Sequence, residues 1–221
     1  MDEDARLSSV EIPGPAGRLE GLINTSGDRS PRALAVLAHP LPTAGGTMHT
    51  KALFHAAKAL SRIDCAALRF NFRGTGRSAG AFDDGPGEIE DFRAAVDFLA
   101  ARYPEVKDIW AAGMSFGAWV ALTAGAADPR VTALIGIAPP VAQRDFEQVV
   151  SAAKPIFLIH GERDELIPLR EVRRFYGRLA EPKELVVIDS AHLFDGRSAE
   201  VGEAIEDLLR DFPPEAAGVM S

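Results

Sequence analysis

The chain has 221 residues, a formal charge of −8 and a pI near 5.2, and these values already exclude some classes of protein. Such a length is typical of one globular domain, here residues 1–221, with a sizeable core. The acidic balance argues against binding to a nucleic-acid backbone, because phosphate contacts need clustered Lys and Arg side chains.

No segment has the pattern of a secretion leader or a membrane span. The first six residues, MDEDAR, are neither basic nor apolar, and no run reaches the roughly 18 apolar residues of a membrane helix. We therefore expect a cytoplasmic protein that does not contact a membrane.

The single cysteine, Cys65, cannot form an internal disulfide, and its place at the start of an apolar run predicts a buried, unreactive thiol.

The chain begins with a predicted antiparallel hairpin, in which residues 7–12 and 19–24 flank a turn rich in Pro and Gly. After this hairpin, short apolar runs alternate with segments of helical spacing. The predicted strands are 33–38, 66–72, 109–112, 131–138, 155–159 and 185–188, and the predicted helices are 51–63, 89–102, 118–127, 169–179 and 199–212. This alternation predicts a doubly wound α/β fold, with a mostly parallel sheet of about eight strands covered by helices on both faces.

The segment Gly113-Met114-Ser115-Phe116-Gly117 joins a predicted strand to a predicted helix. Glycines two positions before and after a serine allow a turn so tight that the serine is exposed on it. Asp164 and His192 also follow predicted strands, and ligands bind beyond the carboxyl ends of strands in such sheets. The chain order serine, acid, histidine indicates a nucleophile, Ser115, a base, His192, and an acid that orients the base, Asp164.

Other assignments of these residues remain open. Ser115 could cap an ordinary helix, His192 could be a solvent-exposed loop residue, and Asp189 is a rival acid. Asp189 lies too near His192 along the chain to approach it as a triad acid usually does. The remaining histidines do not fit the chain order; they are His39, His49, His55 and His160.

Two backbone N–H groups are predicted to bind the negatively charged oxygen that develops during acyl transfer. Phe116, directly after the nucleophile, supplies one of them. Leu41 supplies the other, because Pro40 and Pro42 on either side of it have no N–H. Thr43 is the alternative donor.

Two charged segments are not predicted to bind phosphate or metal. Residues 73–78 are glycine-rich and basic, but they lack the P-loop spacing and are expected to form a turn. The carboxylates within residues 83–91 precede a helix and stabilise its N-terminal dipole. No His or Cys joins them at metal-ligand spacing, so we expect neither a metal nor a cofactor.

Through these motifs the chain resembles the α/β-hydrolase superfamily over nearly its whole length. The sequence RGTGRS at 73–78 is similar to the loop that follows a central strand in many members. HPLP at 39–42, GGTM at 45–48 and RFNFRG at 69–74 are similar to a group of small, capless bacterial hydrolases related to dienelactone hydrolases and short-chain esterases. That group has HPHP where this chain has Leu41, a difference that concerns substrate preference more than chemistry.

The segment 139–154 is too short for the cap domain that many such hydrolases carry, so an open site is expected. Phe82, Trp119, Val141 and Phe146 are predicted to line an apolar acyl pocket, although a place in the core is the alternative. An uncapped, shallow, apolar site suits small or short-chain esters.

The residues and the resemblance together favour a serine carboxylesterase that cleaves a small-molecule ester through an acyl-enzyme. A peptidase or amidase and a lactone hydrolase use the same three residues, and a non-catalytic binding module is the third class of alternative. The sequence reveals no dedicated acidic group for a free amine. A homodimer is compatible with the sequence.

Overall fold

The computed structural model describes residues 5–27 and 30–213, and its centre is an eight-stranded sheet in the order β1-β2-β4-β3-β5-β6-β7-β8. β1 (Ala5–Gly14) and β2 (Gly17–Ser26) form the predicted hairpin, and β2 pairs antiparallel with β4. From β4 onward, all neighbouring strands are parallel: β3 (Ala33–Ala38), β4 (Cys65–Phe70), β5 (Ile109–Met114), β6 (Val131–Ile137), β7 (Ile156–Gly161) and β8 (Lys183–Ile188). The predicted doubly wound, mostly parallel fold is confirmed.

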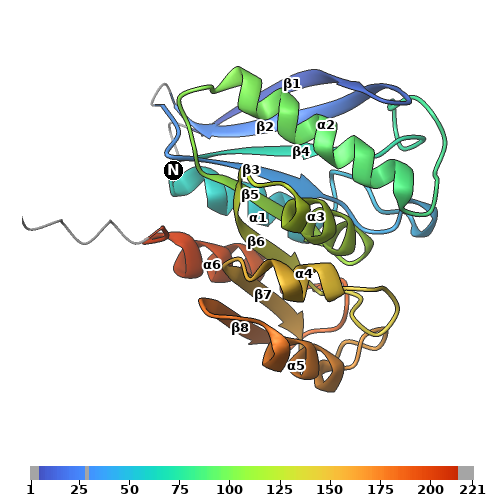
Figure 1. Cartoon of the computed structure of the whole chain (residues 1–221), viewed down its shortest axis with the longest axis vertical. Helices are drawn as coiled ribbons and strands as arrows, with labels where there is room; N and C mark the ends of the chain where they lie inside the picture. Colours follow the sequence, from blue (N-terminus) through green and yellow to red (C-terminus); the bar gives the residue numbers. More distant parts are fainter. Residues whose placement is uncertain (1–4, 28–29, 214–221) are drawn as a thin grey trace, which may run out of the picture.

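Helices cover both faces of this sheet. In Figure 1, the near face carries α2 (Pro86–Arg102), α3 (Phe116–Ala127), α4 (Glu147–Ala152) and α5 (Leu169–Arg178), and the far face carries α1 (Lys51–Arg62) and α6 (Ser198–Leu209). Side chains alternate between the two faces along each strand, so Leu34 and Val36 belong to one core cluster and Ala35 and Leu37 to the other. All residues of β3 are buried because both faces are covered.

The helix α2 begins earlier than its apolar spacing predicts. Pro86 occupies its first turn, and Glu88 is fully buried at the third position, where its carboxylate accepts the backbone N–H groups of Asp83 and Gly85 at 2.9 and 2.7 Å. These bonds satisfy N–H groups that have no partner within the helix. Glu88 therefore caps the N-terminus of α2.

Residues 73–78 form the predicted turn, with Gly74 and Gly76 at φ values of 71° and 58°. The Arg73 guanidinium is paired with the buried Asp91 through bonds of 2.8 to 3.1 Å, and the Arg77 guanidinium pairs with Glu20 at 2.8 Å, so both basic side chains of this turn already have partners within the protein. Within residues 5–27 and 30–213, no three His, Cys, Asp or Glu side chains are grouped to hold a metal ion.

Burial raises the pKa of the Cys65 thiol to about 12, as expected for an unreactive cysteine.

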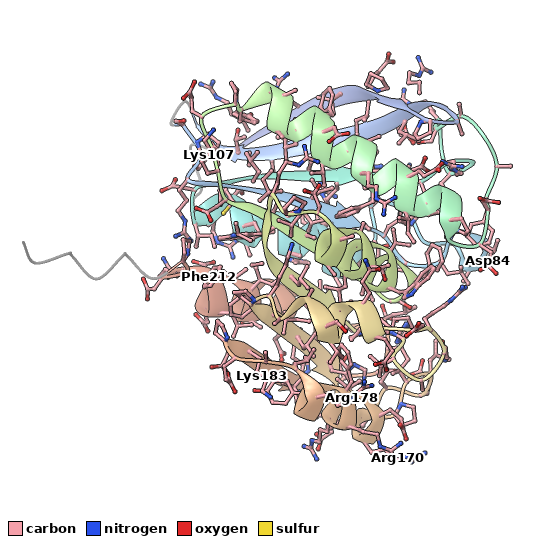
Figure 2. All side chains as sticks on the ribbon, viewed as in Figure 1. Asp84, Lys107, Arg170, Arg178, Lys183 and Phe212 are labelled. Atoms are coloured by element: carbon pink, nitrogen blue, oxygen red, sulfur yellow. The ribbon has the colours of Figure 1, made fainter. Side chains whose placement is uncertain are left out.

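The parallel strands end at one edge of the sheet, and this edge is open. Figure 2 labels Asp84 and Arg170 on the side toward which the strands run, and Lys107 and Phe212 on the opposite side. Between β6 and β7, the chain contains only the six-residue α4, so no cap domain covers the edge, as predicted. None of the helices in the described part of the chain is long and apolar enough to cross a membrane.

Candidate active site

Ser115 lies on a tight turn between β5 and α3, with a φ of 53° and a ψ of −122°. A non-glycine residue in this region of backbone conformation costs about 1–3 kcal/mol. The flanking glycines make the turn feasible. A Cβ at Gly113 would lie 2.2 Å from the Gly117 oxygen, and a Cβ at Gly117 would lie 2.3 Å from the oxygens of both Ala38 and His39. The turn therefore packs backbone against backbone and exposes the serine.

The three residues predicted to act together form one hydrogen-bonded chain. His192 Nε2 lies 2.9 Å from Ser115 Oγ, and His192 Nδ1 lies 2.8 Å from Asp164 Oδ2. The other oxygen of Asp164 accepts the backbone N–H groups of Leu166 and Ile167 at 2.9 and 2.8 Å. Because the carboxylate accepts from Nδ1, the proton sits there, and Nε2 is free to accept the serine proton.

The surroundings of Asp164 keep it ionised. Burial alone would raise the pKa of this carboxyl group, but the hydrogen bonds from His192 and from the backbone outweigh burial and lower the pKa below its usual value. The rival Asp189 is 54% exposed and pairs with Arg163 at 3.0 Å. Geometry therefore places Asp164, and not Asp189, beside the imidazole. The buried His160 lies next to this loop and contacts the Ile167 oxygen at 2.9 Å through Nε2.

A cavity of about 380 Å³ opens at Ser115. Its wall is mainly apolar, and Leu166 and Leu193, which are 56% and 50% exposed, lie on it. Besides these two leucines, Ser115 and His192, the lining comprises Pro40, Leu41, Ala44, Gly45, Gly46, Thr50, Phe116, Pro140, Gln143, Arg144 and Glu165.

The four residues predicted to line the acyl pocket are not among the lining residues of this cavity. The Phe82 ring packs on Phe116, with 5.7 Å between centroids, and Val141 packs against the core. Trp119 lies beneath Arg144, whose guanidinium carbon is 4.7 Å from the centroid of the indole. Phe146 packs against Phe175, which belongs to α5. The alternative, a place in the core, holds for the buried Phe146, whereas Phe82, Trp119 and Val141 are partly buried and pack against the core.

Sequence reasoning missed two charged side chains of the cavity. Arg144 stacks over Phe116 and Trp119 and pairs with Asp84 at 2.6 Å. Glu165 accepts the backbone N–H of His192 at 3.1 Å. Glu165 directly follows Asp164 in the sequence, and this position could have indicated that it lies at the site. Nothing in the sequence around Arg144 indicates that this residue lines the cavity.

The two predicted N–H donors lie on the cavity. Phe116 and Leu41 both line it, and within the described residues the backbone N–H of neither forms a hydrogen bond. The alternative donor, Thr43, is not among the lining residues. A serine that is hydrogen-bonded to a histidine, beside two backbone N–H groups without a hydrogen bond at the same cavity, is the arrangement that acyl transfer requires.

The fold and this site define the chain as an α/β hydrolase without a lid, and comparisons with known proteins agree. The family model Hydrolase_4, described as serine aminopeptidase, S33, matches residues 29–154. The chain belongs to this family, and it is a serine hydrolase.

Three relatives are similar over most of their length. The α/β serine hydrolase without lid XC6422 from Xanthomonas campestris is 34% identical, with a TM-score of 0.86 and 96% of both chains covered. An α/β serine hydrolase homologue from Coxiella burnetii is 36% identical, with a TM-score of 0.85, covering 91% of this chain and 97% of that one. The uncharacterised protein RP471 of Rickettsia prowazekii (strain Madrid E) is 34% identical over 213 residues, 92% of this chain and 89% of that protein.

Proposed function

We propose that the chain is a carboxylester hydrolase that cleaves small esters with short acyl chains through an acyl-enzyme intermediate. The observation that carries this proposal is the unbroken chain of hydrogen bonds from Asp164 through His192 to Ser115, whose serine end opens onto an apolar cavity.

Each residue has a role in this reaction. Ser115 Oγ attacks the ester carbonyl carbon while His192 Nε2 takes the serine proton, and Asp164 stabilises the imidazolium that forms. The N–H groups of Phe116 and Leu41 bind the oxygen that becomes negative. The tetrahedral intermediate expels the alcohol, which receives the proton from His192. Water then repeats the sequence on the acyl-enzyme and releases the acid.

The dimensions and the chemistry of the cavity favour small substrates. Its volume of about 380 Å³ lies at the lower end of the range for small-molecule sites. The apolar wall, which includes Leu41, Phe116 and Leu166, suits an alkyl acyl group and excludes water from it. No lid extends this wall into a groove for a long chain.

An aminopeptidase is the second candidate, because one observation favours it. The carboxylate of Glu165 lies in the wall beside His192, where it would attract a free ammonium group of a peptide substrate. The family model also carries the description serine aminopeptidase. A lactone hydrolase would use the same three residues on a cyclic ester.

A substrate panel separates these candidates. We expect rapid hydrolysis of p-nitrophenyl acetate and butyrate, falling rates with longer acyl chains, and slower turnover of aminoacyl anilides. Faster turnover of anilides would favour the peptidase, and faster turnover of lactones would favour the lactone hydrolase.

The serine itself is tested by Ser115→Ala, which should reduce kcat by about 10⁶-fold. Ser151→Ala, on the exposed face of α4, is the matched control and should behave as wild type. A fluorophosphonate should label the wild type and not Ser115→Ala. Ester hydrolysis at the wild-type rate in Ser115→Ala would end the serine mechanism, and a wild type that neither reacts with the probe nor turns over any substrate would favour the binding module.

A further inference from the structure

We propose that His39 is a positioning residue that orients the Pro40–Leu41 peptide so that the Leu41 N–H points into the cavity. This inference rests on the proposed function, since it explains how one of the two oxyanion donors is held. His39 itself does not touch the substrate, because its side chain is fully buried behind the cavity wall.

The hydrogen bonds of His39 fix which ring nitrogen carries the proton. His39 directly follows β3, and its ring packs on Phe72 with 4.7 Å between centroids. The Phe72 backbone N–H donates to Nε2 at 3.1 Å, so Nε2 carries no proton. In the neutral ring the proton is therefore on Nδ1, which donates to the Pro40 oxygen at 2.7 Å. Burial lowers the pKa of His39 to about 4, which keeps the ring neutral near pH 7.

The bond to Pro40 determines the direction of the next N–H. The Pro40–Leu41 peptide is trans, and in a trans peptide the C=O and the N–H point in opposite directions. Because the carbonyl of Pro40 is held toward the buried imidazole, the N–H of Leu41 is directed away from it. Leu41 lies on the cavity, and among the described residues no acceptor binds this N–H.

The surrounding backbone leaves the peptide little freedom to rotate. The Leu41 oxygen accepts the N–H groups of Ala44 and Gly46 at 3.1 and 3.0 Å, which fixes the following peptide as well. A Cβ at Gly46 would lie only 2.1 Å from the Pro40 oxygen, so this glycine packs directly on the carbonyl. A rotated peptide would turn the Pro40 oxygen toward the developing negative charge, and repulsion would replace a hydrogen bond.

Two substitutions separate the two bonds of the imidazole. The side-chain nitrogen of Asn occupies about the position of His Nδ1, so His39→Asn can keep the bond to the Pro40 oxygen. The side-chain oxygen of Gln occupies about the position of Nε2, so His39→Gln can keep only the bond from Phe72. We expect His39→Gln to lower kcat by about 10²-fold with little change in KM, as for the loss of one oxyanion donor, and His39→Asn to stay within about tenfold of wild type.

A second measurement separates positioning from simple destabilisation. A trifluoromethyl ketone forms a hemiketal oxyanion on Ser115, so its affinity should fall in parallel with kcat/KM in His39→Gln. Phe92→Leu truncates another fully buried ring, in α2 and outside the cavity lining, and should lower the melting temperature without changing kcat or this affinity. Equal losses in the Asn and Gln variants, or wild-type kcat in His39→Gln, would overturn the proposal.

Two further readouts keep the test independent of the substrate and of variant folding. If the wild type hydrolyses none of the panel, the rate of fluorophosphonate labelling of Ser115 replaces kcat, and the same order of variants is expected. Nitrogen NMR of the wild type should show His39 with its proton on Nδ1. A proton on Nε2 would contradict the proposed orientation, whatever the substrate.

Discussion

Replacing Asp164 by Asn keeps the shape of the acid but should reverse the proton arrangement of His192. The asparagine oxygen is expected to stay on the N–H groups of Leu166 and Ile167, since an NH₂ group there would leave buried donors unpaired at about 1–3 kcal/mol each. The NH₂ group would then face His192 Nδ1, which lies 2.8 Å from the carboxylate in the wild type. Nδ1 must accept, and the proton moves to Nε2.

A protonated Nε2 would donate to Ser115 Oγ and could no longer take its proton. We expect kcat to fall by about 10⁴-fold, equivalent to about 5 kcal/mol of transition-state stabilisation. His192→Ala should cost more, about 10⁶-fold, because the base itself is lost. Since the base survives in Asp164→Asn, that variant should keep the higher residual rate.

The assay is nitrophenolate release from p-nitrophenyl acetate, with circular dichroism to show that each variant is folded. Asp189→Asn is the matched control, because Asp189 is exposed and pairs only with Arg163 among the ion pairs of the described residues. It should hydrolyse the ester at the wild-type rate. A loss below tenfold in Asp164→Asn, or a larger loss in Asp189→Asn, would refute the assignment of the acid.

Three further outcomes are expected. Leu41→Pro removes a backbone N–H and should lower kcat by about 10²-fold or more in a folded protein. Leu41→Ala keeps this N–H, so it should change acyl preference and largely keep turnover. Near-normal kcat in Leu41→Pro would assign the donor to another residue. Gly117→Ala places a Cβ 2.3 Å from two backbone oxygens and should lower the melting temperature sharply. In the control Gly177→Ala, no atom lies within 4 Å of the new Cβ, so this substitution should stabilise α5 by about 0.5–1 kcal/mol. Equal melting temperatures of the two variants would contradict the close packing at Gly117. The pKa of His39 is about 4 in the folded protein and 6.5 in the unfolded chain. The unfolded state therefore binds the proton first as the pH falls. The free energy of unfolding should decrease by about 3 kcal/mol as the pH drops from 6.5 to 4. Urea titrations should show a smaller fall in His39→Asn, and identical pH dependence in both proteins would contradict the buried, neutral imidazole.

Much of the fold could be predicted from the sequence because its signals are local. Both faces of β3 are covered, so its residues are apolar without interruption, and the predicted bounds 33–38 are those observed. The start of α2 was predicted too late, because Pro86 and Glu88 open the helix through cap bonds and not through apolar spacing.

The hydrogen-bonded chain of Ser115, Asp164 and His192 could be predicted from the sequence, whereas the residues of the cavity wall could not. Ser115 and its flanking glycines form a pattern with a steric cause, and the strand ends bring Asp164 and His192 to the same edge of the sheet. The wall depends on packing between distant segments. The sequence alone does not show whether an aromatic residue such as Trp119 lines the cavity or packs behind it, because Arg144, which lies over the indole, comes from a distant segment.

The order of residues in the wall constrains how the substrate range of this enzyme can be altered. Phe116, Glu165 and Leu193 each directly follow one residue of the Ser115–Asp164–His192 chain, so a substitution at any of them alters the backbone next to that chain. Gln143 and Arg144 also face the cavity, but their segment carries none of the three. Variation in that segment can therefore reshape the cavity and leave the hydrogen-bonded chain unchanged, and laboratory selection for new substrates should begin there.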